Sequence, residues 1–440
     1  MRTNVVRLDV FLLRYAIREI VDVMQKLSEI DPEYRFVREN IGDPIAKNWP
    51  VADFVKEILI EEIKRKENTV FGYSHSRGMP AVRKWVVEYA KRYSPNCVLD
   101  YESVLFSNGL GSAIAVLYHM LPRGARILQP APCYPTHASF ESFAAGEEPL
   151  LYHLDSANSW QPDLDQMESQ IRKHPEIAGI LVINPNNPTG AVYSGDILER
   201  IVRIAEENKL MVISDEIYFR MIYNGRTHVH LSEIAAGRIP LIVLKGLSKD
   251  VPWPGSRCGW IEFHNINIDD GYRGFCEAIK KRVLLEVCST TMPQTVVPRI
   301  YDHPKFEEWL RQNNKALEEN GNRIAQILSA VPALRVTQPD GAFYMMPLFE
   351  KGALNHQQTL PIRSPHARTF IEAEVSRPGV LPDKRFTYYL LASTGICVVP
   401  ASGFYCPEPG FRLTTLERNA ELRDATYRRL STAISDYVNS

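Results

Sequence analysis

The chain has 440 residues, more than one ordinary domain of about 100–200 residues contains. Hydrophobic residues make up 45% and charged residues 23%, a composition typical of soluble globular proteins. The sum of 51 basic and 52 acidic residues is −1, which argues against electrostatic binding of nucleic acid or of an anionic membrane.

The cysteines and the N-terminus indicate the compartment. Seven cysteines without a CxxC pair fit neither a disulfide scaffold nor a zinc site, so free thiols in a reducing compartment are expected. No run approaches the roughly 18 apolar residues of a membrane span. Arg2, Arg7, Asp9 and Arg14 interrupt the apolar N-terminus, which argues against a signal peptide. We therefore expect a cytoplasmic protein.

The first 300 residues predict alternating strands and helices. Residues 11–28 repeat apolar positions at helical spacing, and Gly42 and Pro44 then mark a loop. The expected strands are 104–107, 126–129, 179–184, 210–214, 239–245 and 258–263, and the expected helices are 51–67, 78–93, 110–121 and 195–208. This alternation predicts a mostly parallel, seven-stranded-type α/β sheet with helices on both faces.

The C-terminal third predicts a different architecture. A charged helix over 306–328 precedes short strands at 334–337, 343–347 and 411–415, while 351–385 contains several prolines and little periodicity. We expect a large α/β domain over 45–300. A smaller α+β domain would combine 1–44 with 301–440, with an irregular insertion near 351–385.

Three polar segments follow predicted strands. They are 184–190 (Asn-Pro-Asn-Asn-Pro-Thr-Gly), 214–218 (Ser-Asp-Glu-Ile-Tyr) and 246–249 (Gly-Leu-Ser-Lys), with Arg257 eight positions beyond the lysine. Open α/β sheets bind ligands beyond the carboxyl ends of their parallel strands. We therefore expect an amide, a carboxylate, an amine and a guanidinium to meet in one crevice.

Pyridoxal phosphate requires this set of groups. Its aldehyde needs a lysine amine, and its pyridine nitrogen needs a carboxylate, so that the ring can act as an electron sink. Its phosphate needs an arginine and backbone N–H groups, which 107–112 (Ser-Asn-Gly-Leu-Gly-Ser) supplies before an apolar helix. Tyr134 is placed to cover the ring.

Taken together, these motifs resemble the fold-type-I, class I and II aminotransferases that depend on pyridoxal phosphate. The greatest likeness is to bacterial glutamate–pyruvate (alanine) aminotransferases and covers essentially the whole chain. It is carried by 15–18 (Tyr-Ala-Ile-Arg), 41–44 (Ile-Gly-Asp-Pro), 184–194, 215–218, 246–249 and 341–344 (Gly-Ala-Phe-Tyr).

The resemblance implies a role for each matching residue. Lys249 would form a Schiff base and move the proton, Asp215 would pair with the pyridine nitrogen, and Asn187 and Tyr218 would bond the ring oxygen. Tyr134 would stack on the ring. The phosphate would be held by Gly109, Leu110, Gly111, Ser248, Arg257 and, from the neighbouring subunit of a homodimer, Tyr73. The substrate would be held by Arg412, Gly42, Tyr15 and Asn187.

The implied reaction moves an amino group between a small amino acid, such as alanine, and a 2-oxo acid, such as 2-oxoglutarate. A lyase, decarboxylase or cyclase using the same cofactor is the alternative, because fold does not determine chemistry. A cofactor-binding regulator is disfavoured because the chain shows no helix-turn-helix signature.

Some features limit the resemblance. Gly246 stands where many members have serine, 250–254 is rigid and aromatic, and both 250–254 and 351–385 are expected beside the site. A dicarboxylate substrate calls for a second arginine opposite Arg412; Arg282 is an arginine in the right general region of the chain, but the sequence does not place it in the pocket. His75, His119 and His137 form no metal-ligand spacing and are interpreted as incidental; no metal is expected.

Overall fold

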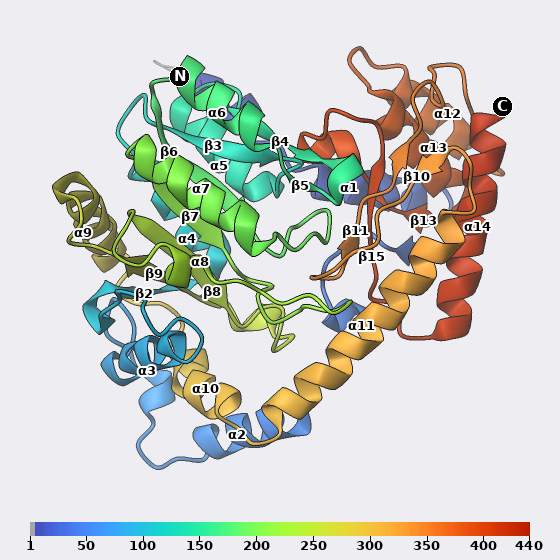
Figure 1. Cartoon of the computed structure of the whole chain (residues 1–440). Coiled ribbons are helices and arrows are strands. Elements are labelled where there is room, and N and C mark those ends of the chain that lie inside the picture. Colours follow the sequence, from blue (N-terminus) through green and yellow to red (C-terminus); the bar gives the residue numbers. More distant parts are fainter. Residues whose placement is uncertain (1–4) are drawn as a thin grey trace.

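The computed structural model describes residues 5–440 (Figure 1). Its centre is an eight-stranded sheet in the order β2-β9-β8-β7-β6-β3-β4-β5. The bounds are β2 Val104–Asn108, β3 Arg126–Ala131, β4 Leu151–Asp155, β5 Gln161–Pro162, β6 Ile177–Ile183, β7 Met211–Asp215, β8 Leu241–Gly246 and β9 Cys258–His264. The five strands β4, β3, β6, β7 and β8 pair in parallel, whereas β9 is antiparallel to both its neighbours. The expected mostly parallel sheet is therefore confirmed, with the two-residue β5 added at one edge.

Apolar side chains alternate between the two faces of the sheet. Leu181 and Ile213 join a cluster with α4 (Leu110–His119) and α9 (Asp270–Leu284). Ile180 and Val212 join the opposite cluster, with α6 (Leu164–Lys173), α7 (Gly195–Glu207) and α8 (Leu231–Ile234). Strands that are buried on both faces need apolar residues at nearly every position, which explains their uninterrupted hydrophobic runs.

A second layer is built from both ends of the chain. The helix α1 (Ala16–Ile30) packs against α12 (Pro365–Val375) and α13 (Pro382–Thr394), and the strand β1 (Val37–Arg38) pairs in parallel with β13 (Ile396–Cys397). The helix α14 (Ala420–Val438) packs against α11 (Phe306–Leu328). Small sheets complete it: β10 (Leu334–Arg335) with β12 (Leu348–Phe349), and β11 (Tyr344–Met345) with β15 (Phe411–Thr414) and β14 (Val399–Pro400).

Three further helices pack together at the lower edge of the molecule in Figure 1. Helices α2 (Asp53–Ile63), α3 (Pro80–Lys91) and α10 (Thr291–Tyr301) pack together below the sheet, and α11 runs from this group to the C-terminal layer (Figure 1). Helix α5 (Pro135–Ala145) packs against α4. Within the described range, no helix is both long and apolar enough to cross a membrane.

Two sequence expectations were wrong. The segment 351–385 is not a long irregular insertion, because it contains all of α12, whose Ile371 is fully buried. The sequence analysis did not predict strands β4 and β5. In β4, buried and exposed residues alternate, as in a strand with one face open to solvent.

Candidate active site

A cavity of about 470 Å³ lies at the carboxyl edge of the central strands. It is bounded by the ends of β6 and β7, the residues after β8, the start of α4, the segment around Gly42 and strand β15. The predicted residues that line it are Tyr15, Gly42, Leu110, Gly111, Tyr134, Asn187, Asp215, Tyr218, Ser248, Lys249, Arg257 and Arg412. Three segments that are distant in sequence therefore meet in one crevice, as the strand pattern predicts.

Lys249 lies just beyond β8 and points into this cavity. Its Nζ donates a hydrogen bond to the carbonyl oxygen of Gly42 at 2.8 Å. The ammonium lies over the rings of Tyr218 and Phe343, 5.9 and 5.5 Å from their centroids. Burial disfavours the charged amine and lowers the pKa of Lys249 to about 8, although the Asp43 carboxylate opposes this effect.

Asp215 ends β7 and begins a chain of hydrogen bonds. His137 Nε2 lies 3.1 Å from Asp215 Oδ2, and His137 Nδ1 lies 3.1 Å from the Tyr118 hydroxyl. Gln129 Nε2 donates to that hydroxyl at 3.1 Å. The Tyr118 oxygen accepts a hydrogen bond from Gln129, so the Tyr118 hydroxyl can donate its proton to His137 Nδ1. His137 then carries its proton on Nε2 and donates it to the Asp215 carboxylate.

His137 is therefore not incidental, and that interpretation was wrong. Its side chain is completely buried on α5. A histidine at one position of a helix gives no signal in the sequence that it will face a carboxylate from a strand. Only the packing of α5 beside β7 brings the two together.

Arg412 and Asn187 lie side by side in the wall of the cavity. Arg412 is 1% exposed, lies 4.6 Å above the Tyr344 ring and donates from Nη1 to Asn187 Oδ1 at 3.4 Å. Its Nη2 donates to the Asn40 carbonyl, whereas its buried Nε has no partner among the described residues. Burial lowers the pKa of Arg412. A buried guanidinium that retains a free donor is suited to bind a carboxylate.

The loop that carries Asn187 is held by its neighbour. Asn186 Oδ1 accepts from the Thr189 N–H at 3.1 Å and from the Thr189 hydroxyl at 2.8 Å. This Asx-type turn leaves the Asn187 side chain free to face the cavity.

An anion cradle lies at the start of α4. Gly109 has φ of +78°, a left-handed backbone conformation that favours glycine, and the Arg257 guanidinium lies where a Cβ would project. The first N–H groups of α4, at Leu110 and Gly111, have no helical carbonyl partner. Ser248 and Arg257 border the same end of the cavity. The presence of glycine at position 246 also has a steric reason. A Cβ there would lie 2.7 Å from the Cys258 carbonyl oxygen of the adjacent strand.

Four tyrosines close the cavity. The hydroxyls of Tyr15 and Tyr134 lie 3.4 Å apart, and those of Tyr218 and Tyr344 lie 3.1 Å apart. Burial raises the pKa of Tyr218 well above its usual value, so its hydroxyl keeps its proton and can donate.

Two named residues lie elsewhere. The Tyr73 side chain is 87% exposed and lies outside the cavity of its own chain. Arg282 pairs with Glu286 at 3.2 Å on the surface of α9, so the expectation of a second arginine falls instead on Arg18, which lines the cavity. Of the segments expected beside the site, 250–254 contributes Pro254, but 351–385 contributes nothing to the lining.

Sequence reasoning also missed Asp43 and Tyr344, which line the cavity. Both were present in the quoted motifs 41–44 and 341–344. The motifs indicated which segments lie near the cavity, but only the positions of the side chains show which residue of each motif lines it.

Comparison with known proteins assigns the family. Residues 45–428 match the model of the class I and II aminotransferases, and the chain belongs to this family. It is therefore a transferase of the aminotransferase type. The cofactor is pyridoxal phosphate, which class I and II aminotransferases of this fold use.

Several relatives span nearly the whole chain. An uncharacterized aminotransferase of Methanocaldococcus jannaschii is 40% identical over 440 residues, which is 100% of both chains. Glutamate-pyruvate aminotransferase AlaA of Escherichia coli K12 is 26% identical over 90% of each chain. The solved structure of an alanine aminotransferase from Pyrococcus furiosus is 29% identical, with a TM-score of 0.83 over 98% of this chain and 100% of that one. Because 98% of this chain is covered, at least part of 351–385 has a counterpart in the Pyrococcus furiosus structure.

The observed residues fit the cofactor. The glycine approach at Gly109 and the free N–H groups of α4 suit a phosphate, and Asp215 and Lys249 bring a carboxylate and an amine of lowered pKa to the same cavity. When bound there, pyridoxal phosphate would supply an electron sink for negative charge that develops on a substrate carbon.

The lowered pKa of Lys249 can be measured in cofactor-free protein. We expect its acetylation by a trace of acetic anhydride to rise with pH around a midpoint of about 8, because burial favours the neutral amine. Mass spectrometry of the Lys249 peptide, with N-α-acetyl-lysine as internal reference, follows the reaction. A midpoint near the ordinary 10.5 would contradict the assignment.

Proposed function

We propose that this protein transfers an amino group between a small amino acid, alanine, and 2-oxoglutarate, with Lys249 as the residue that forms the Schiff base. The observation that carries the proposal is that Lys249, Asp215 and Arg412 line one cavity together with Arg18. The printed names of the relatives, glutamate-pyruvate and alanine aminotransferase, support the same pair of substrates.

Lys249 acts as the proton carrier. Once its Nζ is not bonded to the cofactor, the amine would move a proton from the substrate Cα to C4′ of the cofactor in the first half-reaction, and from C4′ to Cα of the new product in the second. Because its pKa is about 8, a useful fraction of the amine is neutral near pH 7, which an ordinary lysine would not provide. The Gly42 carbonyl at 2.8 Å orients Nζ.

Asp215 and Tyr218 adjust the cofactor. Asp215 holds the proton on the pyridine nitrogen, and the His137 Nε2–H fixes the direction of its carboxylate. Tyr218 and Asn187 donate to the ring oxygen, and Tyr134 stacks on the ring. Leu110 and Gly111 hold the phosphate through backbone N–H groups, Ser248 through its hydroxyl and Arg257 through its guanidinium, while Gly109 provides the turn before them.

The substrate binds between two arginines. Arg412 grips the α-carboxylate, with Asn187 beside it, and Tyr15 and Gly42 cover the substrate from the N-terminal segment. The guanidinium of Arg18 is exposed and makes no hydrogen bond or ion pair with any described residue, although Arg18 lines the cavity. A free guanidinium in the cavity suits the second carboxylate of glutamate and 2-oxoglutarate.

The protein works as a homodimer in the cytoplasm. Tyr73 is exposed and lies outside the cavity of its own chain, which is compatible with its proposed contact with the phosphate of a neighbouring subunit. All seven cysteines are unpaired, which fits a reducing compartment.

The substrates are tested by single half-reactions of the holoenzyme with one amino acid at a time. We expect alanine and glutamate each to bleach the cofactor absorbance and yield one equivalent of oxo acid, and pyruvate or 2-oxoglutarate to restore it. Lys249→Ala should bind cofactor non-covalently and show no such conversion. Bleaching by other amino acids but by neither of these two would overturn the substrate assignment.

Arg18 is tested by Arg18→Gln. We expect kcat/KM for glutamate and 2-oxoglutarate to fall about 10- to 100-fold, the effect of losing one charged hydrogen bond, while alanine and pyruvate change little. Arg14→Gln is the matched control, because Arg14 lies on the same segment but pairs with Glu148 at 2.6 Å. An equal loss for all four substrates would contradict a role in binding the second carboxylate.

Tyr73 is tested by subunit complementation. Tyr73→Ala alone should weaken cofactor binding, and co-expression with Lys249→Ala should create one dimer site that contains both wild-type side chains. We expect that mixed dimer to regain activity and tight cofactor binding at this site, and ultracentrifugation to show a dimer. A monomer, or failure of the mixture to exceed Tyr73→Ala alone, would reject the arrangement.

A further inference from the structure

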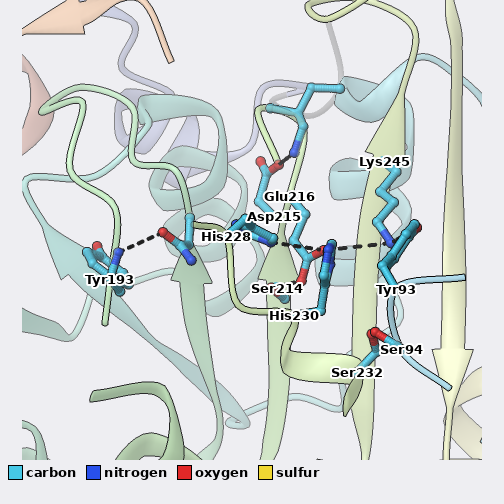
Figure 2. A network of polar contacts seen from close by, with 12 residues as sticks. Tyr93, Ser94, Tyr193, Ser214, Asp215, Glu216, His228, His230, Ser232 and Lys245 are labelled. Carbon is cyan, nitrogen blue, oxygen red and sulfur yellow. Dashed lines mark hydrogen bonds and ion pairs between the residues drawn. The ribbon is translucent and has the colours of Figure 1, made fainter. Parts of the chain in front are cut away.

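A buried polar network lies beside the candidate active site but does not line its cavity (Figure 2). Asp215 faces the cavity, and the next residue, Glu216, faces this network instead. The other ionisable side chains that meet there are Tyr93, His228, His230, Lys245, Glu262 and His264. None of them lines the cavity of the candidate active site.

The two oxygens of Glu216 have different surroundings. Ser214 Oγ donates to Oε1 at 3.1 Å and so fixes the plane of the carboxylate. Oε2 faces His228 Nε2 at 3.6 Å and His230 Nδ1 at 3.4 Å. The ligand atoms of Glu216, His228 and His230 all lie within 4.8 Å of one another.

His228 is the unexplained member of this group. Its side chain is 5% exposed, yet neither ring nitrogen has a hydrogen-bond partner among residues 5–440. A buried imidazole whose nitrogens lack a full hydrogen bond is costly, and a ligand between Nε2 and the Glu216 carboxylate, now 3.6 Å apart, would satisfy Nε2. The nitrogen nearest to Glu216 already points towards the carboxylate.

The charges of the network favour a cation. Glu216 and Glu262 carry two negative charges, and both share Lys245, whose Nζ lies 3.7 Å from Glu216 and 3.3 Å from Glu262. Lys245 also donates to the Tyr93 hydroxyl at 3.0 Å, and His264 Nε2 lies 3.1 Å from Glu262. The two carboxylates and one ammonium sum to −1, with Lys245 Nζ 3.7 Å from Glu216 Oε2, the oxygen that also faces the histidines.

We propose that Glu216, His228 and His230 form a binding site for a divalent transition-metal ion of the zinc type. Two imidazoles and one carboxylate are ligands that zinc accepts, and tetrahedral ligands about 2.0–2.1 Å from zinc are separated by about 3.3 Å. The measured separations of 3.4 and 3.6 Å are close to that value. The hydrogen bond from Ser214 orients the carboxylate, as outer partners of metal ligands do.

The ion would have a structural effect. It would tie the segment before α8, which carries His228 and His230, to the residue that follows Asp215. The site does not depend on which amino acid the enzyme uses, so it can be tested independently of the proposed reaction.

The experiment uses holoenzyme stripped of metal with a chelator and then titrated with zinc chloride alone. We expect one equivalent to bind with micromolar or tighter affinity in calorimetry and to raise the melting temperature by several degrees. X-ray absorption at the zinc edge should show nitrogen and oxygen neighbours at about 2.0–2.1 Å. His228→Ala should lose this binding at least 10-fold, while His119→Ala, an exposed histidine on α4, should retain it.

The spectroscopic measurement keeps the test valid if His228→Ala folds poorly, because it needs only the wild-type protein. A sulfur shell near 2.3 Å would assign the zinc to the free cysteines and overturn the proposal. Absence of stoichiometric binding, or equal binding in His228→Ala and wild type, would overturn it too. Loss of amino transfer in an enzyme that still binds zinc would concern only the proposed function.

Discussion

The parallel pairing of β6, β7 and β8 is the constraint on which the active site depends. Ile183 is paired with Asp215, and Asp215 with Leu244, so the three strands end at the same edge of the sheet. The loop that carries Asn187, the carboxylate of Asp215 and the turn that carries Lys249 therefore start from the same height. A shift of one strand by one residue would turn Asp215 away from the cavity and Glu216 into it, because side chains alternate along a strand.

Burial shifts the pKa values of charged side chains both in the cavity and in the polar network around Glu216. In the cavity, Lys249 and Arg412 both have lowered pKa values because water is excluded around them. For Lys249 the result is an amine that can be neutral near physiological pH, whereas Arg412 stays charged and keeps its free Nε. On the opposite side, Lys245 lies between two carboxylates, which raise its pKa and keep its charge. Two lysines four positions apart thus have pKa values shifted in opposite directions because of their neighbours.

The sequence predicted the parts of the site that local motifs specify. The loop at 184–190, the glycine approach to α4 and the lysine after β8 follow from turn and strand chemistry at adjacent positions, and α11 matched its predicted bounds. His137 and Arg18 could not be identified in this way. Each comes from a helix whose own periodicity says only which face is apolar, and each reaches the site through the packing of that helix against a distant strand or turn. The prolines of 351–385 made α12 hard to predict, although Pro365 and Pro382 lie at the first position of α12 and α13, where proline is tolerated.

The hydrogen bond between Lys249 Nζ and the Gly42 carbonyl joins two segments that are 207 positions apart. A Cβ at position 42 would overlap the Tyr344 side chain, so the backbone there is already as close to the cavity wall as it can be. The carbonyl thus has one donor and little room to seek another. Whenever the amine bonds to another partner, the Gly42 carbonyl loses this donor, while the Asn40 carbonyl two residues away keeps its bond to Arg412. Mobility that rises at Gly42 but not at Asn40 therefore reports that Lys249 is bonded elsewhere.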